Sequence, residues 1–446
     1  MLATKYYGRL VLKSDVPKEI LDNNPFEEME AICIKNGKIL CNRCGQITNK
    51  NQGYLPNNNY YCPKCIILGR MSTLQKLVYL PNMKEKFTLP NEVLTWKGNL
   101  SKYQQKCSQE LQTAIEKRQR FLLWAVTGAG KTEMLFKPLE RGIKAGLRIA
   151  IASPRVDVCN ELFPRIDAAF KHVSKILLHG RTDVKYEYTQ IVVCTTHQLL
   201  NFKAAFDILI IDEVDSFPYV NDNGLKFAAQ KAIKDNGALI YLTATPSHEL
   251  SQQIKRNQLI TSYLPLRFHQ NPLPEIKLLF SNNWWQEISE KKQLNRKVIK
   301  ILKQWVQSEN QFLIFVPHVS MLEAVFQVIQ ENLPANIKGQ TVHAQDPLRI
   351  EKVQMMRDKE IRYLITTTIL ERGVTFPKID LIVLGADNEV FSISSLVQIA
   401  GRVGRSLDRP KGDVYFMCDN YTKTVHKAKQ QIIFLNRKAK KMLANE

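Results

Sequence analysis

The chain has 446 residues, of which 44% are apolar and 24% charged, as expected for a globular protein of two or three domains. Its 63 Lys and Arg against 42 Asp and Glu give a formal net charge of +21. This excess favours a polyanionic partner, either nucleic acid or an anionic membrane surface. The sequence contains no signal peptide and no apolar run of membrane-spanning length, so it predicts neither secretion nor an intrinsic membrane span.

Four of the nine cysteines lie close together in the amino-terminal segment, which we assign to residues 1–95. They form two Cys-x-x-Cys pairs, Cys41 with Cys44 and Cys62 with Cys65, seventeen residues apart. Two such knuckles aim four thiolates at one point, which predicts a closed, structural Zn²⁺ site within about residues 38–70. The other cysteines are scattered, and together with a metal cluster this pattern indicates a reducing, cytoplasmic compartment.

The amino-terminal segment is also basic, with thirteen Lys or Arg against seven Asp or Glu through residue 90. Tyr54, Tyr60 and Tyr61, with Lys50 and Arg70, would suit base stacking and phosphate contact. The tyrosines would equally suit the small core of a zinc ribbon. Both interpretations stay open on the sequence alone.

A buried strand, a tight loop and a helix are predicted in that order between residues 121 and 146. Phe121–Val126 is a short apolar run, and helical spacing begins at Glu133. Small residues in the loop allow successive backbone N–H groups to surround a polyphosphate, with a lysine on the β and γ phosphates and a threonine hydroxyl on Mg²⁺. The predicted ATP and Mg²⁺ ligands are Thr127, Gly128, Ala129, Gly130, Lys131 and Thr132.

Four further apolar runs, each separated by helical spacing, predict a parallel α/β sheet in the first large domain, residues 96–265. They are residues 148–152, 191–194, 206–211 and 238–242. The third ends in Asp212 and Glu213, which would hold Mg²⁺ and activate the attacking water, respectively. The fourth is followed by Thr243-Ala-Thr-Pro-Ser247, whose hydroxyls could link the nucleotide site to a polynucleotide track.

A Pro-bearing stretch predicts a linker over residues 266–284, followed by a second α/β domain over residues 285–446 that has no phosphate loop. Arg402 and Arg405 are predicted to lie late on a helix, where their spacing would place them on one face. They could neutralise the charge that develops on the γ phosphate. His426–Leu443 predicts a basic amphipathic helix, either for packing on this domain or for an acidic partner.

The ordered motifs from Gln104 to Arg405 resemble those of superfamily 2 helicases. The resemblance implies two tandem RecA-like parallel-sheet domains behind a small four-cysteine zinc-ribbon domain. It also implies that Gln104 reads the adenine, that Gly373 and Arg405 lie at the nucleotide and that Gln398 supports catalysis. The implied nucleic-acid contacts are Ser153, Pro154, Arg155, Thr195, Thr196, His197, Thr367 and Arg372.

A zinc module in front of a compact motor further resembles the ComFA family of late-competence ATPases. This resemblance implies a single-stranded DNA translocase for the uptake of transforming DNA, acting at the inner face of the cell membrane. The implied partners are a ComFC-type protein and the membrane channel. Primosomal PriA helicases are similar in the motor but place cysteines in its second half, where this chain has only Cys418.

Two other functions are compatible with the same motifs. One is a general repair or replication-restart helicase, which would separate a tailed duplex. The other is a zinc-ribbon DNA-binding adaptor that uses ATP only as a conformational switch, although Glu213 and both arginines argue for hydrolysis. The motifs leave open the polarity, the oligomeric state and the choice between DNA and RNA.

Overall fold

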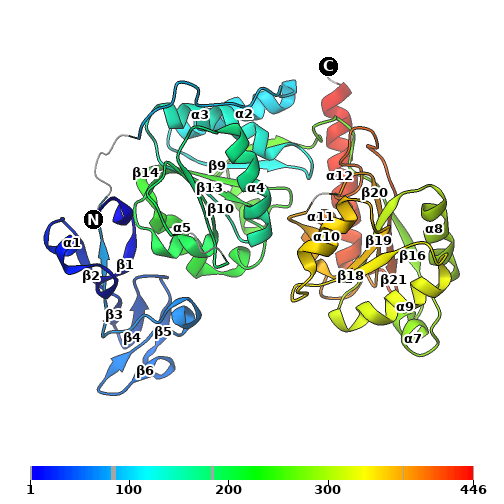
Figure 1. Cartoon of the computed structure of the whole chain (residues 1–446), viewed down its shortest axis with the longest axis horizontal. Coiled ribbons are helices and arrows are strands. Elements are labelled where there is room, and N and C mark those ends of the chain that lie inside the picture. Colours follow the sequence, from blue (N-terminus) through cyan, green and yellow to red (C-terminus); the bar gives the residue numbers. More distant parts are fainter. Residues whose placement is uncertain (1–2, 82–86, 182–184, 375, 445–446) are drawn as a thin grey trace. The chain divides into compact units, whose positions relative to one another are not determined.

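The computed structural model describes residues 3–81, 87–181, 185–374 and 376–444 (Figure 1). The chain forms two compact units, Met1–Trp124 with Lys131–Leu264, and Ala125–Gly130 with Pro265–Glu446. Among the described residues, none of the helices combines the length and the apolar character that crossing a bilayer requires.

The amino-terminal part of the first unit consists of small antiparallel sheets. The order of the first sheet is β1-β8-β2, and a second sheet, β3-β4-β5, precedes the two-stranded ribbon β6-β7. The bounds are β1 Leu10–Leu12, α1 Lys18–Asp22, β2 Glu27–Glu30, β3 Ile32–Lys35, β4 Lys38–Cys41, β5 Ile47–Asn49, β6 Tyr54–Leu55, β7 Asn59–Tyr60, the 3-10 helix η4 Pro63–Leu68 and β8 Lys76–Tyr79.

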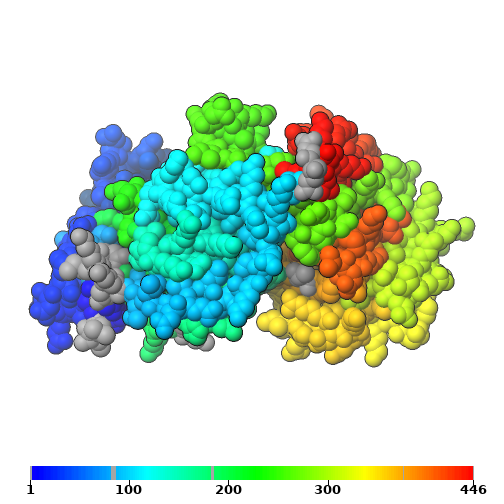
Figure 2. Space-filling model, turned by 90° about the horizontal axis from the view of Figure 1, so that it is seen from above, coloured from blue at the N-terminus to red at the C-terminus, as the bar shows by residue number. Residues whose placement is uncertain are grey.

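A seven-stranded sheet forms the rest of the first unit, in the order β11-β12-β10-β13-β14-β9-β15. The residues of β10 and β12 are buried throughout, because a parallel sheet is covered on both faces. Helices α2 and α3 fall in the cyan to teal area of the face seen in Figure 2. The strands are β9 Arg120–Ala125, β10 Ile149–Ser153, β11 Lys175–Leu178, β12 Ile191–Thr195, β13 Phe206–Asp212, β14 Ile233–Thr243 and β15 Ile260–Leu264. The helices are α2 Lys102–Glu116, α3 Lys131–Lys144, α4 Val156–Ala169, the 3-10 helix η5 Thr196–Asn201, α5 Asn223–Ala232 and α6 His248–Lys255.

The second unit is built on a six-stranded sheet in the order β16-β21-β20-β17-β19-β18, in which neighbouring strands pair in parallel. Its strands are β16 Ile276–Phe280, β17 Gln311–Phe315, β18 Gly339–Val342, β19 Tyr363–Thr366, β20 Ile379–Leu384 and β21 Val414–Cys418. Its helices are α7 Trp284–Ser289, α8 Arg296–Gln307, α9 Leu322–Asn332, α10 Arg349–Arg357, the 3-10 helix η8 Thr368–Glu371, α11 Ile393–Ala400 and α12 Lys423–Ala444.

The two parallel sheets behind a small four-cysteine domain confirm the predicted fold class. The structure differs from the expected linker of residues 266–284, because β16 lies inside that range and pairs with β21. The sequence analysis did not predict β11, β15 or β16, which are four or five residues long and lie at sheet edges. A run this short carries little periodicity, so neighbouring strands decide its conformation.

The basic carboxyl-terminal helix packs on its own unit, as one of the two interpretations expected. Val425, Ala428, Ile432, Leu435 and Ala439 form its buried stripe. The side chain of Asn436 accepts a hydrogen bond from Leu273 N at 2.8 Å and donates one to Leu273 O at 2.9 Å. Helix α12 therefore holds the segment that leads into β16.

Candidate nucleotide, nucleic-acid and zinc sites

The predicted phosphate loop joins the carboxyl end of β9 to the first residue of α3, Lys131. Gly128 and Gly130 have φ angles of +77° and +75°, in the left-handed region that glycine adopts without strain. Thr132 lies in the first turn of α3, where N–H groups without intrahelical partners and the helix dipole favour an anion. The local structure therefore has the strand, turn and helix that a triphosphate requires.

Asp212 and Glu213 lie at the end of β13, on the same edge of the sheet as the phosphate loop. This follows from the strand order, since β14 pairs in parallel with both β9 and β13. The Asp212 carboxylate accepts a hydrogen bond from Glu213 N at 2.9 Å. Glu213 has a φ of +53°, a conformation that costs a non-glycine residue about 1 kcal/mol and is often found at functional sites.

Asp215 links this acidic pair to the end of the neighbouring strand. Its two carboxylate oxygens accept hydrogen bonds from Thr243 Oγ1 and Thr245 Oγ1, both at 2.6 Å, and all three side chains are buried. The sequence analysis expected the threonines to connect two sites but assigned no role to Asp215. The structure shows that Asp215 fixes both hydroxyls.

Gln104 lies in the first turn of α2 and forms a capping box with Ser101. Its side-chain oxygen accepts from Ser101 N at 2.8 Å, and Gln104 N donates to Ser101 Oγ at 3.4 Å. The Ser-x-x-Gln signature of this cap was available in the sequence and was missed. Helix α2 also contacts α3, because Ser108 Oγ donates to Met134 O at 2.9 Å.

The residues expected to contact nucleic acid in the first unit follow β10 and β12, which pair in parallel. Ser153 ends β10, Thr195 ends β12, and Thr196 and His197 begin η5. The hydroxyls of Ser153 and Thr196 are buried and have no hydrogen-bond partner among the described residues. Burial lowers the pKa of His197, which is half-buried, while the nearby Asp222 opposes this shift. Pro154 and Arg155 continue from Ser153 into α4.

In the second unit, the expected contact Arg372 is buried, with 4% of its surface exposed. Its Nη2 donates to Ser394 Oγ at 2.9 Å, and its Nε lies 3.6 Å from the Glu371 carboxylate, which also accepts from Ser395 Oγ. Thr367 precedes η8 and is partly exposed, and Gly373 follows Arg372 with a φ of +72°. Thr375, two residues after Gly373, lies outside the described residues.

The expectation that Arg402 and Arg405 share a helical face is wrong. Gln398 lies on α11, but that helix ends at Ala400, and residues 401–404 form a turn. Gly404 has a φ of +70°, a left-handed conformation that does not occur inside an α-helix, so the helix cannot continue through this residue. Arg405 folds back so that its Nε donates to Gly401 O at 3.2 Å, and Arg402 is only 2% exposed.

Arg267, which lies in the segment before β16, binds this turn. Its guanidinium donates to Gly404 O at 2.6 Å and to Gly401 O at 3.2 Å, and the residue is 2% exposed. Burial lowers the pKa of Arg267 to about 9, which leaves it charged at neutral pH. A cation at the carboxyl end of α11 also complements the helix dipole. No local sequence pattern connects Arg267 with Gly401, so sequence analysis could not identify it.

The four clustered cysteines are buried, and their sulfur atoms all lie within 4.8 Å of one another. Cys41 Sγ lies 3.8 Å from Cys65 Sγ, and Cys44 Sγ lies 3.6 Å from Cys62 Sγ. A Zn–S distance of about 2.3 Å places tetrahedral thiolates about 3.8 Å apart, so the cluster fits a structural zinc ion. Hydrogen bonds from the other three thiols, led by Cys44, lower the pKa of Cys41 and favour the thiolate that a metal requires.

Three family models match successive parts of the chain. Residues 2–79 match the competence protein ComFA N-terminal domain, residues 97–248 the type III restriction enzyme res subunit, and residues 293–406 the helicase conserved C-terminal domain. The solved structure of Mycobacterium smegmatis helicase Lhr bound to ssDNA and AMP-PNP is similar in fold, with a TM-score of 0.55 and 15% identity, over 75% of this chain and 50% of that one.

Two curated relatives match nearly the whole chain. Competence protein ComFA of Streptococcus pneumoniae is 40% identical over 97% of this chain and 98% of its own length. Competence protein ComFA of Bacillus subtilis is 42% identical over 92% of this chain and 89% of its own length. The chain therefore belongs to the ComFA family of competence proteins, and its two α/β units are the ATPase lobes of a superfamily 2 helicase.

Proposed function

We propose that the chain is an ATP-driven translocase on single-stranded DNA that takes part in the uptake of transforming DNA. The observation that carries this proposal is the shared edge of the first sheet. There the phosphate loop, Asp212 and the polar ends of β10 and β12 follow neighbouring strands. A nucleotide and a polynucleotide bound at one edge can influence each other through the strands between them.

In this proposal Lys131 and the loop N–H groups bind the β and γ phosphates, while Thr132 and Asp212 hold Mg²⁺, which would offset charge on the phosphates. Glu213 orients the attacking water and accepts its proton. Arg402 and Arg405 stabilise charge on the γ phosphate, and the turn that carries them is fixed by Arg267.

Coupling between hydrolysis and movement would pass through Asp215. Asp215 follows Glu213 by two residues and binds both Thr243 and Thr245. A change in the acidic pair when the γ phosphate leaves would therefore shift the end of β14. Successive changes in the grip of the two lobes on one strand would produce stepping.

The likeness to the competence relatives supports a cellular role in DNA uptake. We infer a cytoplasmic position at the inner face of the cell membrane, with a ComFC-type protein and the membrane channel as partners. The formal net charge of +21 favours both a DNA strand and an anionic surface.

The decisive experiment measures steady-state ATP hydrolysis with single-stranded DNA, duplex DNA and RNA as separate activators at moderate salt. We expect strong stimulation by single-stranded DNA and no turnover in the Glu213→Gln variant. Equal stimulation by duplex DNA, with separation of a tailed duplex, would instead assign the chain to repair or replication restart. DNA binding without any hydrolysis would assign it to the adaptor class.

A further inference from the structure

We propose that the zinc module, residues 32–73, positions η5 and thereby sets the affinity of the motor for single-stranded DNA, with Lys231 as the residue that joins the two. The inference rests on the proposed function, because η5 contributes Thr196 and His197 to the expected nucleic-acid contacts. The zinc module would thus act on DNA binding by the first lobe, in addition to holding its metal ion.

Lys231 connects the module to η5 directly. It lies on α5, and its Nζ donates to Arg43 O at 2.6 Å and to Leu200 O at 3.0 Å. Arg43 lies between the first two zinc-site cysteines, and Leu200 lies within η5. One amine therefore satisfies a carbonyl in each element, and a shift of either element would break a hydrogen bond.

The Arg43 side chain adds a second connection between the same elements. Its guanidinium donates to Leu68 O at 2.7 Å and to Gly69 O at 3.0 Å, which holds the second knuckle against the first. Its Nη2 also lies 3.5 Å from Asn201 Oδ1, at the end of η5. Arg43 is 8% exposed, so these contacts lie within the packed interface.

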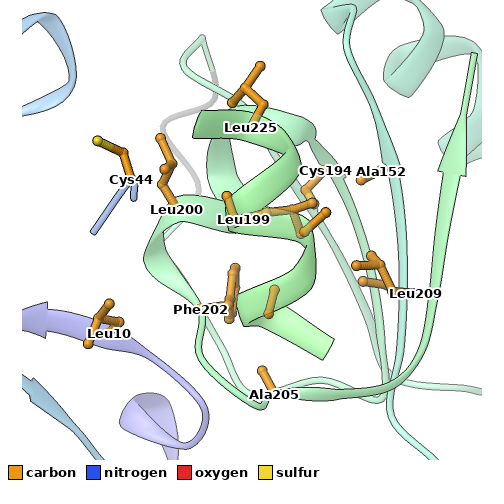
Figure 3. Close-up of a cluster of buried hydrophobic side chains, with 14 of the residues drawn as sticks. Leu10, Cys44, Ala152, Cys194, Leu199, Leu200, Phe202, Ala205, Leu209 and Leu225 are labelled. Carbon is orange, nitrogen blue, oxygen red and sulfur yellow. The ribbon is translucent and has the colours of Figure 1, made fainter. Parts of the chain in front are cut away.

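Apolar packing joins the module to the same region. Cys44, Leu199, Leu200 and Leu225 belong to one buried cluster, which Figure 3 shows around η5 and α5. A Cβ on Gly45 would lie 2.5 Å from the Phe227 ring, so the knuckle and α5 are in close contact. The zinc knuckles thus form part of the hydrophobic core beneath η5.

An ion pair lies at the amino end of α5. Lys64 Nζ of the second knuckle lies 2.9 Å from Asp222 Oδ2, while Asp222 Oδ1 caps α5 by accepting from Gly224 N and Leu225 N. Both charges act on His197, the expected DNA contact in η5. The module therefore reaches the start of η5 as well as its end.

The chain just after η5 is held by the amino-terminal segment as well. Lys203 N donates to Gly8 O at 3.0 Å, and Arg9 pairs with Phe202 in an antiparallel bridge.

The acidic pair that we assign to hydrolysis follows β13, and β10 separates β13 from β12. A displaced η5 should therefore weaken DNA binding while the hydrolytic groups keep their geometry.

The test compares Lys231→Met with Lys226→Met in the full, zinc-loaded chain. Both variants replace one lysine of α5 by methionine, but Lys226 pairs with Glu249 rather than with a residue of the zinc module. Binding is measured by fluorescence anisotropy with a labelled oligothymidylate, alongside zinc content and ATP hydrolysis. For Lys231→Met we expect the Kd and the half-stimulating DNA concentration to rise about tenfold, with basal hydrolysis, kcat at saturating DNA and zinc content retained.

Equal affinity in the two methionine variants would overturn the inference while leaving the proposed function intact. So would a fall in kcat at unchanged Kd, which is the result of a purely structural defect. A wild-type chain that does not bind single-stranded DNA would instead refute the proposed function, and this inference with it.

If Lys231→Met does not fold, Asp222→Asn provides an independent test of the inference. Asparagine still caps α5 but loses the ion pair to Lys64. Simple electrostatics predicts tighter DNA binding, because a negative charge near His197 is removed. Positioning by the module predicts weaker binding, so unchanged or tighter binding in this variant overturns the inference.

Discussion

Replacing Arg267 by methionine should impair hydrolysis although Arg267 lies outside every recognised motif. Methionine retains most of the apolar stem but cannot donate to Gly401 O or Gly404 O. Both carbonyls belong to the turn that carries Arg402 and Arg405. We expect the turn to lose its fixed position and the two arginines to lose theirs.

The expected magnitude follows from the two lost bonds and the burial of the guanidinium. A hydrogen bond to a charged group contributes about 1.5–3 kcal/mol, so the gross loss is about 3–6 kcal/mol. Removing a buried charge recovers several kcal/mol of desolvation cost, so the unfolding free energy should fall by only about 1–3 kcal/mol. The same displacement should lower kcat at least about tenfold, which corresponds to about 1.4 kcal/mol of transition-state stabilisation.

The assay is DNA-stimulated ATP hydrolysis with kcat and KM determined separately, together with urea unfolding. Arg267→Lys is the graded control, because one ammonium can replace only part of the fork and should give an intermediate kcat. The reasoning is refuted if folded Arg267→Met hydrolyses ATP at the wild-type kcat.

Three further outcomes are expected. Lys131→Ala and Glu213→Gln should each abolish turnover in a folded chain, and DNA-stimulated hydrolysis at wild-type rates in both would contradict the assigned ATP site. Metal analysis of native protein should find one Zn²⁺ per chain, and Cys44→Ser should lower both the zinc content and the melting temperature; a zinc-free, equally stable wild type would argue against the site. Asp215→Asn should retain much of the basal hydrolysis but reduce its stimulation by DNA, since the asparagine amide keeps one acceptor oxygen and one of the two hydroxyls, Thr243 or Thr245, loses its acceptor; stimulation unchanged from wild type would show that coupling takes another route.

The parts of the fold that sequence reasoning identified are those specified by local patterns. The phosphate loop lies between an apolar strand and a helix within about a dozen residues, and Cys41 and Cys62 each begin a knuckle whose spacing is nearly unambiguous. Tyr60 is buried, as the core interpretation expected, whereas the exposed Tyr54 stays a predicted base-stacking residue.

The remaining parts depend on residues far apart in the chain. Arg267 contacts Gly404, and Lys231 contacts Arg43, and nothing local signals either pair. The error at Arg402 has a different origin, because helical spacing continues past Ala400 while Gly401 and Gly404 end the helix. A glycine after a helical run predicts a helix end. In the structure this glycine signal prevails over the helical spacing of the two arginines.

The order of strands in the second sheet has a consequence for biosynthesis. β16, the first strand of this sheet to be made, pairs with β21, the last, and β21 also separates β16 from the rest of the sheet. Asn436 then binds Leu273, just ahead of β16, from the carboxyl-terminal helix. The seven strands of the first sheet are all complete by Leu264. During translation the first lobe can therefore fold early, whereas the second must wait for nearly the whole chain, and its unpaired β16 is the segment most exposed to misassembly in the interval.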